Sequence, residues 1–264
     1  MATLRVVEIV GPTFSGEGRS IGRPCFFVRL ADCNLHCTWC DTAYAWDWQG
    51  LNGIAYKREV ESRDMEDTSI ATILEEMYAK WSEPRSGFGM PKTLVISGGE
   101  PMVQQARLAE FVRLIQHKGW WVEIETAGTI KDSVGVKPNG WNISPKLASS
   151  GNVVKARYHP DVLRWFSHQN QMAADEGHQP RKFAPNVCFK FVVTSMHASD
   201  DLAEVDWITG DCEIHPRMIW IMAEGKTSDE QREAARMIAP FVLMKGWRMS
   251  PRLQVDLWGN ERGR

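Results

Sequence analysis

Short runs of strand-forming residues alternate along this chain with segments of helical periodicity, and this alternation restricts the fold more than any other feature. Runs rich in β-branched and aromatic residues predict strands at residues 5–10, 26–30, 93–97, 121–125, 141–143, 188–193 and 218–222. Such an alternation is typical of an α/β domain built around a mostly parallel sheet. The number of strands predicts a barrel or an incomplete, TIM-like barrel.

Apolar residues at helical spacing predict the helices between these strands. Ile70, Ile73, Leu74 and Met77 follow the i, i+3, i+4, i+7 rule, with Asp67 or Thr68 to cap the helix and Pro84 to end it. Two further stripes follow the same rule: Leu108, Phe111, Val112 and Ile115, and Ala234, Met237, Ile238 and Phe241. We expect these faces to cover the sheet as core.

The length of 264 residues suits a single domain over residues 1–264. Two polar stretches, 44–69 and 152–185, fit the alternation poorly and are interpreted as insertions or lids.

The overall composition narrows the class of protein. The net charge of −2 and the lack of blocks of like charge make nucleic acid an unexpected partner. No apolar run approaches the roughly 20 residues of a membrane span, and no secretion signal is visible. We therefore expect a cytoplasmic protein without a membrane span.

Three of the six cysteines, Cys33, Cys37 and Cys40, are spaced C-x3-C-x2-C directly after a predicted strand. Three thiolates can hold three irons of a [4Fe–4S] cluster and leave the fourth iron open to a small molecule. A zinc site completed by His36 is the alternative. Cys25, Cys188 and Cys212 are scattered, and we assign them no role.

Polar groups recur just beyond the predicted strands. These are Gly98-Gly99-Glu100-Pro101, Glu125-Thr126 and Ser144-Pro145-Lys146. A ligand lying across the carboxyl ends of parallel strands would require such an arrangement. Two glycines would let the backbone approach that ligand, and Glu100 could accept a hydrogen bond from its amine. Arg29, inside an apolar strand, needs an acidic partner, which could be either structural or a substrate carboxylate.

Taken together, seven segments of the chain resemble the 7-carboxy-7-deazaguanine synthase family of radical S-adenosylmethionine (SAM) lyases. They are residues 16–18, 27–30, 33–42, 97–101, 125–129, 144–146 and 189–193. The resemblance implies an incomplete TIM-like barrel of radical SAM type. It also implies conversion of 6-carboxy-5,6,7,8-tetrahydropterin to 7-carboxy-7-deazaguanine by ring contraction with loss of ammonia, a step toward queuosine and other 7-deazapurines. The implied cofactors are a [4Fe–4S] cluster, SAM and Mg²⁺, which carry out the bond-breaking themselves.

Carried over by position, the resemblance gives each matching residue a role. It assigns the cluster to Cys33, Cys37 and Cys40, magnesium to Thr42, SAM to Gly99, Glu125, Ser144, Pro145 and Lys146, and the pterin to Phe14, Ser15, Gly16, Glu17, Arg29 and Ser97. The chain departs from the family pattern at Ser15, where Gln is usual, at Ser97, where Thr is frequent, at Ala223, where Pro is expected, and at Gln254, near a usual His.

The same resemblance implies a homodimer that receives electrons from a donor such as a flavodoxin or ferredoxin. Two alternatives remain open at this point. One is a glycyl-radical-enzyme activase of the radical SAM superfamily, against which Asp41-Thr42 argues. The other is a non-catalytic zinc-binding module.

Overall fold

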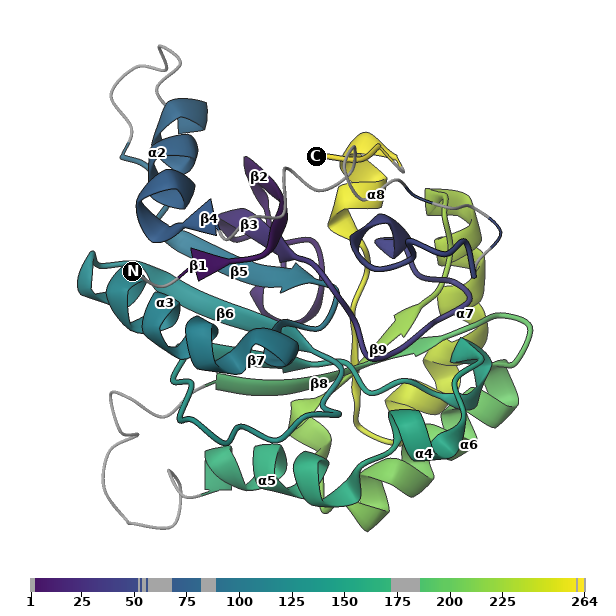
Figure 1. The fold of residues 1–264 in the computed structure, drawn as a ribbon. Helices are drawn as coiled ribbons and strands as arrows, with labels where there is room; N and C mark the ends of the chain where they lie inside the picture. The colour runs from purple at the N-terminus through teal and green to yellow at the C-terminus, as the bar shows by residue number, and fades with distance from the viewer. Residues whose placement is uncertain are drawn as a thin grey trace.

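An eight-stranded sheet curves around the centre of the molecule (Figure 1). The computed structural model describes residues 3–51, 53, 56, 68–81, 89–171, 186–259 and 261–263. The strand order is β10-β9-β8-β7-β6-β5-β3-β2, and all pairs are parallel except β2 with β3. The predicted α/β fold with an incomplete, mostly parallel barrel is therefore confirmed. The strands of this sheet are β2 (Val6–Phe14), β3 (Pro24–Leu30), β5 (Thr93–Gly98), β6 (Trp121–Thr126), β7 (Gly140–Ile143), β8 (Asn186–Val193), β9 (Ile219–Ala223) and β10 (Arg248–Met249).

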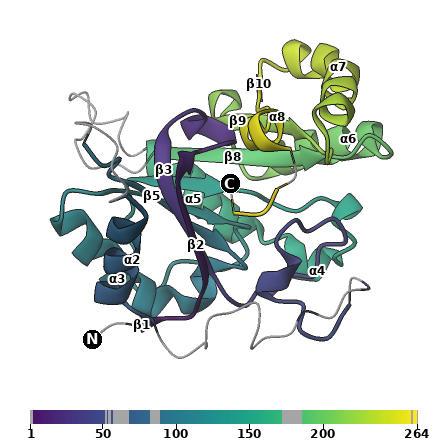
Figure 2. The same cartoon turned by 90° about the horizontal axis from the view of Figure 1, so that it is seen from above.

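Helices cover the outer face of the sheet, as Figures 1 and 2 show from two directions. They are α2 (Ile70–Trp81), α3 (Gln105–His117), α5 (Pro160–Gln171), α6 (Ala198–Asp211) and α7 (Ser228–Met244). Two short helices lie elsewhere: α4 (Val154–Arg157) is next to the cysteine loop, and α8 (Leu253–Trp258) is next to the end of β2. The apolar faces predicted for α2 and α3 are buried in the main core. None of the described helices is long and apolar enough to cross a membrane.

The predicted apolar face of α7 is only partly right. Ala234 and Ile238 are buried, but Met237 is 57% exposed, and Val242 takes the next inward position. The buried stripe thus runs at i, i+4 and i+8, and Met237, which the sequence predicts to be buried, lies to one side of it.

The start of α2 also differs from expectation. Ser69 caps the helix, because its hydroxyl accepts a hydrogen bond from the Thr72 amide at 3.1 Å. Thr68 instead belongs to β4 (Thr68–Ser69), which pairs antiparallel with β1 (Thr3–Leu4). Asp67 and Pro84 lie outside the described residues.

The two stretches interpreted as lids contain packed structure where they are described. Helix α5 lies within 152–185, and its Leu163 and Phe166 are 1% and 0% exposed in the main core. This part is therefore one of the outer helices and no lid. Within 44–69, Tyr44 and Trp46 are buried. Residues 172–185 and much of 52–67 lie outside the described part of the chain.

Polar residues on the strands face the inside of the barrel. On β6, Val122 and Ile124 are fully buried against the outer helices, whereas the alternate residues Glu123 and Glu125 point inward and pair with other polar groups. The outer face therefore supplies the apolar core, and the inner face is left for polar chemistry.

Side chains and loops bridge the gap that the strands leave open between β2 and β10. The Leu253 amide donates to the Gly16 carbonyl at 2.9 Å, and the Gly18 amide donates to the Ser250 hydroxyl at 2.7 Å. The ring of Trp258 on α8 stacks on Phe14 at the end of β2, with 6.4 Å between ring centroids. The segment after β10 thus completes one wall of the barrel.

Candidate active site

A cavity of about 760 Å³ opens inside the barrel at the carboxyl ends of the parallel strands. Most of the residues predicted for the site line it: Phe14, Gly16, Glu17, Arg29, Cys33, Cys37, Cys40, Thr42, Ser97, Gly99, Glu125, Ser144 and Lys146. Ser15 and Pro145 do not. Ser15 is buried, and its backbone pairs with Arg23 and Gly22 of the β2–β3 connection.

The three cysteines of the loop after β3 pack together with Leu35 and Ala127 at one side of this cavity. Each sulfur accepts one N–H: Cys33 from the Leu35 amide at 3.4 Å, Cys40 from the Trp46 indole at 3.3 Å, and Cys37 from the Asn152 amide group at 3.3 Å. Such donors stabilise thiolates and surround metal-bound sulfurs. This donor set fits an iron–sulfur cluster held by three cysteines.

The three thiols do not form a site for a single metal ion in the described structure. Within the described residues, no three His, Cys, Asp or Glu side chains are close enough to hold one metal ion. The His36 ring packs on Trp46, 5.1 Å between ring centroids, instead of joining the thiols. Burial, reinforced by nearby Glu100, raises the pKa of Cys33 to about 12, and the hydrogen bond from the Leu35 amide acts in the opposite direction.

The two glycines after β5 allow the backbone of this segment to pack closely against the end of β3 and Asp32. A Cβ on Gly99 would lie 1.9 Å from the carbonyl oxygen of Asp32, and Gly98 adopts φ of +110°. The close approach lets the Gly99 amide donate to Leu30 at 2.8 Å. The glycines thus fasten β5 to the cysteine loop. Both also border the cavity, and their expected approach to a ligand stays a prediction.

Glu100 is likewise a structural residue. It is 1% exposed, and its carboxylate accepts from the Thr126 hydroxyl at 2.7 Å and from the Met102 and Ala127 amides. Burial raises its pKa, and these hydrogen bonds act in the opposite direction. With both oxygens engaged, Glu100 ties the ends of β5 and β6 together. It also borders the cavity, and its expected role toward a ligand amine stays a prediction.

Glu125 is held in place on the inner face of β6. One carboxylate oxygen accepts from the Ser97 hydroxyl at 2.7 Å, and the other accepts from the Asn142 amide group at 3.2 Å. After the end of β7, Lys146 donates to the Ser144 hydroxyl at 2.9 Å, and its ammonium lies 5.7 Å from the centre of the Trp39 ring. Three neighbouring strands thus present polar groups to the same space.

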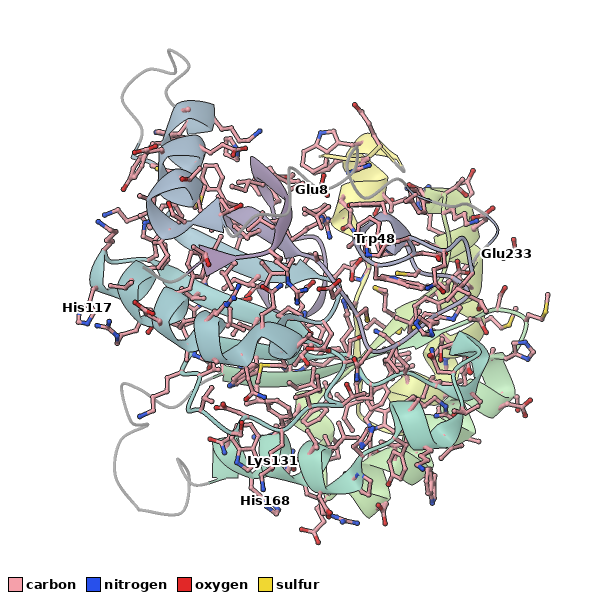
Figure 3. The ribbon with its side chains drawn as sticks, in the orientation of Figure 1. Glu8, Trp48, His117, Lys131, His168 and Glu233 are labelled. Carbon is pink, nitrogen blue, oxygen red and sulfur yellow. The ribbon has the colours of Figure 1, made fainter. Side chains whose placement is uncertain are left out.

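Arg29 finds its acidic partner on the neighbouring strand. Its Nε lies 2.9 Å from a carboxylate oxygen of Glu8, labelled in Figure 3, but the angle is poor for a hydrogen bond. Tyr44 donates its phenol proton to the same oxygen. We regard the Arg29–Glu8 contact as an ion pair, which leaves hydrogen-bonding capacity of the guanidinium at the cavity.

Thr42 sits between the cysteine loop and β5. It is 8% exposed, and its hydroxyl donates to the Gly98 carbonyl at 3.2 Å and lies 3.6 Å from the Cys40 sulfur. A hydroxyl oxygen at this point is a hard donor suited to a hard cation such as Mg²⁺.

Comparisons with known proteins agree with this geometry. A family model described as "4Fe-4S single cluster domain" matches residues 14–134, which include the cysteine loop. The 7-carboxy-7-deazaguanine synthase of Rhodopirellula baltica is 30% identical over 259 residues, covering 97% of this chain and 88% of that protein. The chain belongs to the 7-carboxy-7-deazaguanine synthase family.

Other family members align along the whole chain. The synthase of Pyrobaculum aerophilum is 29% identical over 263 residues, covering 99% of this chain and 97% of that protein. A crystal structure of QueE from Escherichia coli has the same fold, with a TM-score of 0.58 at 21% identity and coverage of 95% and 94% of the two chains. These names favour the synthase over the activase and the zinc module that the sequence left open.

Sequence reasoning missed two cations of this family member's cavity. Lys190 on β8 forms an ion pair with Glu17, and Arg252 donates to Glu17 at 2.8 Å and to Asp41 at 2.7 Å. A charged residue inside the apolar run 187–193 is the same signal that singled out Arg29, so Lys190 could have been found. Arg252 carries no such signal, because it lies in a polar segment.

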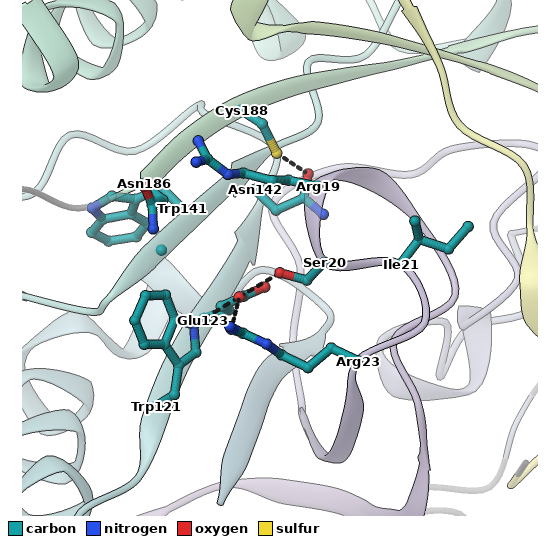
Figure 4. Close-up of a pocket in the computed structure, with 11 residues that line it drawn as sticks. Arg19, Ser20, Ile21, Arg23, Trp121, Glu123, Trp141, Asn142, Asn186 and Cys188 are labelled. Atoms are coloured by element: carbon teal, nitrogen blue, oxygen red, sulfur yellow. Dashed lines mark hydrogen bonds and ion pairs between the residues drawn. The ribbon is translucent and has the colours of Figure 1, made fainter.

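A second cavity, of about 290 Å³, occupies the other end of the synthase barrel (Figure 4). There Glu123 accepts from Ser20 at 2.5 Å and pairs with Arg23, whose guanidinium stacks over Trp121. None of the predicted site residues lines this space. Asn142 borders both cavities.

Proposed function

We propose that this chain is a radical SAM lyase that converts 6-carboxy-5,6,7,8-tetrahydropterin to 7-carboxy-7-deazaguanine, with loss of ammonia, in the synthesis of queuosine precursors. One observation carries the proposal. Three thiols that each accept an N–H border a cavity whose remaining wall presents Glu17, Arg29 and Lys190.

The cofactor side of the cavity is formed by the cysteine loop and the ends of β5, β6 and β7. Cys33, Cys37 and Cys40 hold the cluster, which, when bound, supplies the electron that cleaves SAM. Gly99, Glu125 and the segment 144–146 bind SAM; the carboxylate of Glu125 suits the hydroxyls or the amine of that ligand. Pro145 supports this segment from outside the cavity lining.

The substrate side is formed by the β2–β3 connection and the inner residues of β3, β5 and β8. A pterin carboxylate suits the cationic Arg29, and an acceptor such as Glu17 suits the N–H edge of a pterin ring. Phe14, Gly16 and Ser97 complete this wall, while Ser15 acts through its backbone. Thr42 would give its hydroxyl oxygen to Mg²⁺.

The partners of the reaction follow from its chemistry. The cluster needs a one-electron donor, for which we propose a flavodoxin or a ferredoxin. We also propose a homodimer acting in the cytoplasm.

Turnover under anaerobic conditions tests the function. Reconstituted protein, with the pterin, SAM, Mg²⁺ and a reductant, should form 7-carboxy-7-deazaguanine, identified by mass and ultraviolet spectrum. A glycyl-radical substrate protein in place of the pterin is the matched control and should gain no radical. Intact cluster without the deazaguanine product would refute the proposal.

A further inference from the structure

We propose that Trp46 and Asn152 are positioning residues that raise the reduction potential of the cluster by donating hydrogen bonds to two of its sulfur ligands. The inference rests on the proposed function, because it takes Cys37 and Cys40 as ligands. Neither donor belongs to the segments that carry the family resemblance, and each reaches its sulfur at 3.3 Å.

Trp46 is fixed with its indole N–H toward Cys40. The side chain is 7% exposed, and the His36 ring packs against it. Its backbone amide closes a turn onto the Ala43 carbonyl at 3.0 Å. The indole therefore has little freedom to turn its only donor away from the sulfur.

Asn152 is oriented by both ends of its amide group. Its carbonyl oxygen accepts from the His36 backbone amide at 2.9 Å, which turns its NH₂ group toward Cys37. The Nε of Arg157 donates to the backbone carbonyl oxygen of Asn152 at 3.1 Å. Arg157 is itself 4% exposed and forms an ion pair with Glu204. A residue far along the chain thus clamps the cysteine loop from outside.

Both hydrogen bonds act on the charge of the cluster. Reduction adds a negative charge that is shared with the ligand sulfurs, and an N–H pointed at a sulfur stabilises that charge. The reduced form gains more than the oxidised form. Removing either donor should therefore make the cluster harder to reduce.

Replacement of Trp46 by Phe tests the first donor, because the ring remains while the N–H is lost. Trp48, labelled in Figure 3, provides a matched control, since its buried indole N–H has no partner in the described structure. Asn152→Leu tests the second donor. The measurement is the midpoint potential of the holoenzyme, from a redox titration followed by electron paramagnetic resonance, with iron content determined on each sample.

For W46F and for N152L we expect about a tenfold loss in the equilibrium constant for reduction, which is a shift of roughly 59 mV to lower potential for one electron. W48F should keep the wild-type potential. If W46F matches W48F while both hold their iron, the inference is overturned. If N152L fails to hold iron, the comparison of the midpoint potentials of W46F and W48F still tests the inference. Wild-type protein that binds no cluster would instead refute the proposed function.

Discussion

Lys190 and Glu17 form an ion pair inside the barrel, between β8 and the β2–β3 connection. Both side chains are largely buried, at 8% and 15% exposure. Burial alone would raise the pKa of Glu17, but Lys190 and Arg252 hold that pKa well below its ordinary value of 4.5. The wall of the large cavity therefore contains a carboxylate that stays ionised throughout the physiological range.

Glu17→Gln should destabilise the fold as well as weaken substrate binding, because it leaves two buried cations with less compensation. We expect a loss of about 3 kcal/mol in the free energy of unfolding at pH 7. Urea denaturation of the iron-free protein measures it. Glu123→Gln, in the second cavity, is a control that should leave affinity for the pterin unchanged.

The stabilising effect of Glu17 should depend on pH. Because its pKa is lower in the folded protein, the contribution is fully present above 4.5 and declines as the pH falls below that value. The contribution of Glu17 to the free energy of unfolding of the wild type should therefore fall by about 1 kcal/mol between pH 7 and pH 4. A difference between wild type and E17Q that is equal at both pH values would contradict the ion pair.

Cys37→Ala should abolish the cluster, because two thiolates cannot hold the cubane that three can. Iron content should fall from about four per chain to a small residue, with loss of the brown absorbance. Cys188→Ala is the control: this thiol is buried in the second cavity and should be dispensable. A Cys37→Ala protein that keeps a full complement of iron and its activity would exclude Cys37 as a ligand.

Thr42→Ala should weaken the magnesium dependence of turnover and leave SAM cleavage largely intact, because it removes the hydroxyl oxygen together with one methyl group. Thr42→Ser retains that oxygen and should behave like the wild type. A magnesium titration of product formation tells the variants apart. An identical magnesium response in T42A would remove Thr42 from the metal site.

Gly99→Ala should destabilise the protein by about 2 kcal/mol, because the new methyl group meets a backbone carbonyl that cannot move aside. Gly210→Ala is the control for this substitution, since Gly210 lies on α6 and a Cβ added there would meet no atom within 4 Å. There, alanine should be neutral or stabilising by up to about 1 kcal/mol. Thermal unfolding of both variants gives the comparison, and equal stabilities would contradict the close packing.

The parts of this molecule that obey local rules could be predicted from the sequence. The strands and the faces of α2 and α3 follow from residue periodicity, and the cysteine loop follows from ligand spacing. Arg29 could be marked because a charge in an apolar strand demands a partner, although only the structure identifies that partner as Glu8.

The residues that escaped prediction depend on contacts between distant segments. Asn152 reaches Cys37 across 115 positions, and Arg252 reaches Glu17 across 235, so neither sequence neighbourhood records the contact. The structural role of Glu100 was missed for the same reason, because its partners Thr126 and Ala127 come from another segment. Helix α5 was hidden by its polar composition, which belongs to its solvent-facing side.

The contacts between the segment after β10 and the β2–β3 connection join residues that are synthesised late to residues that are synthesised early. The three thiols are synthesised some two hundred residues before Arg252. A chain that stopped short of Arg252 would contain the whole cysteine loop but would leave Glu17 without one of its two cationic partners.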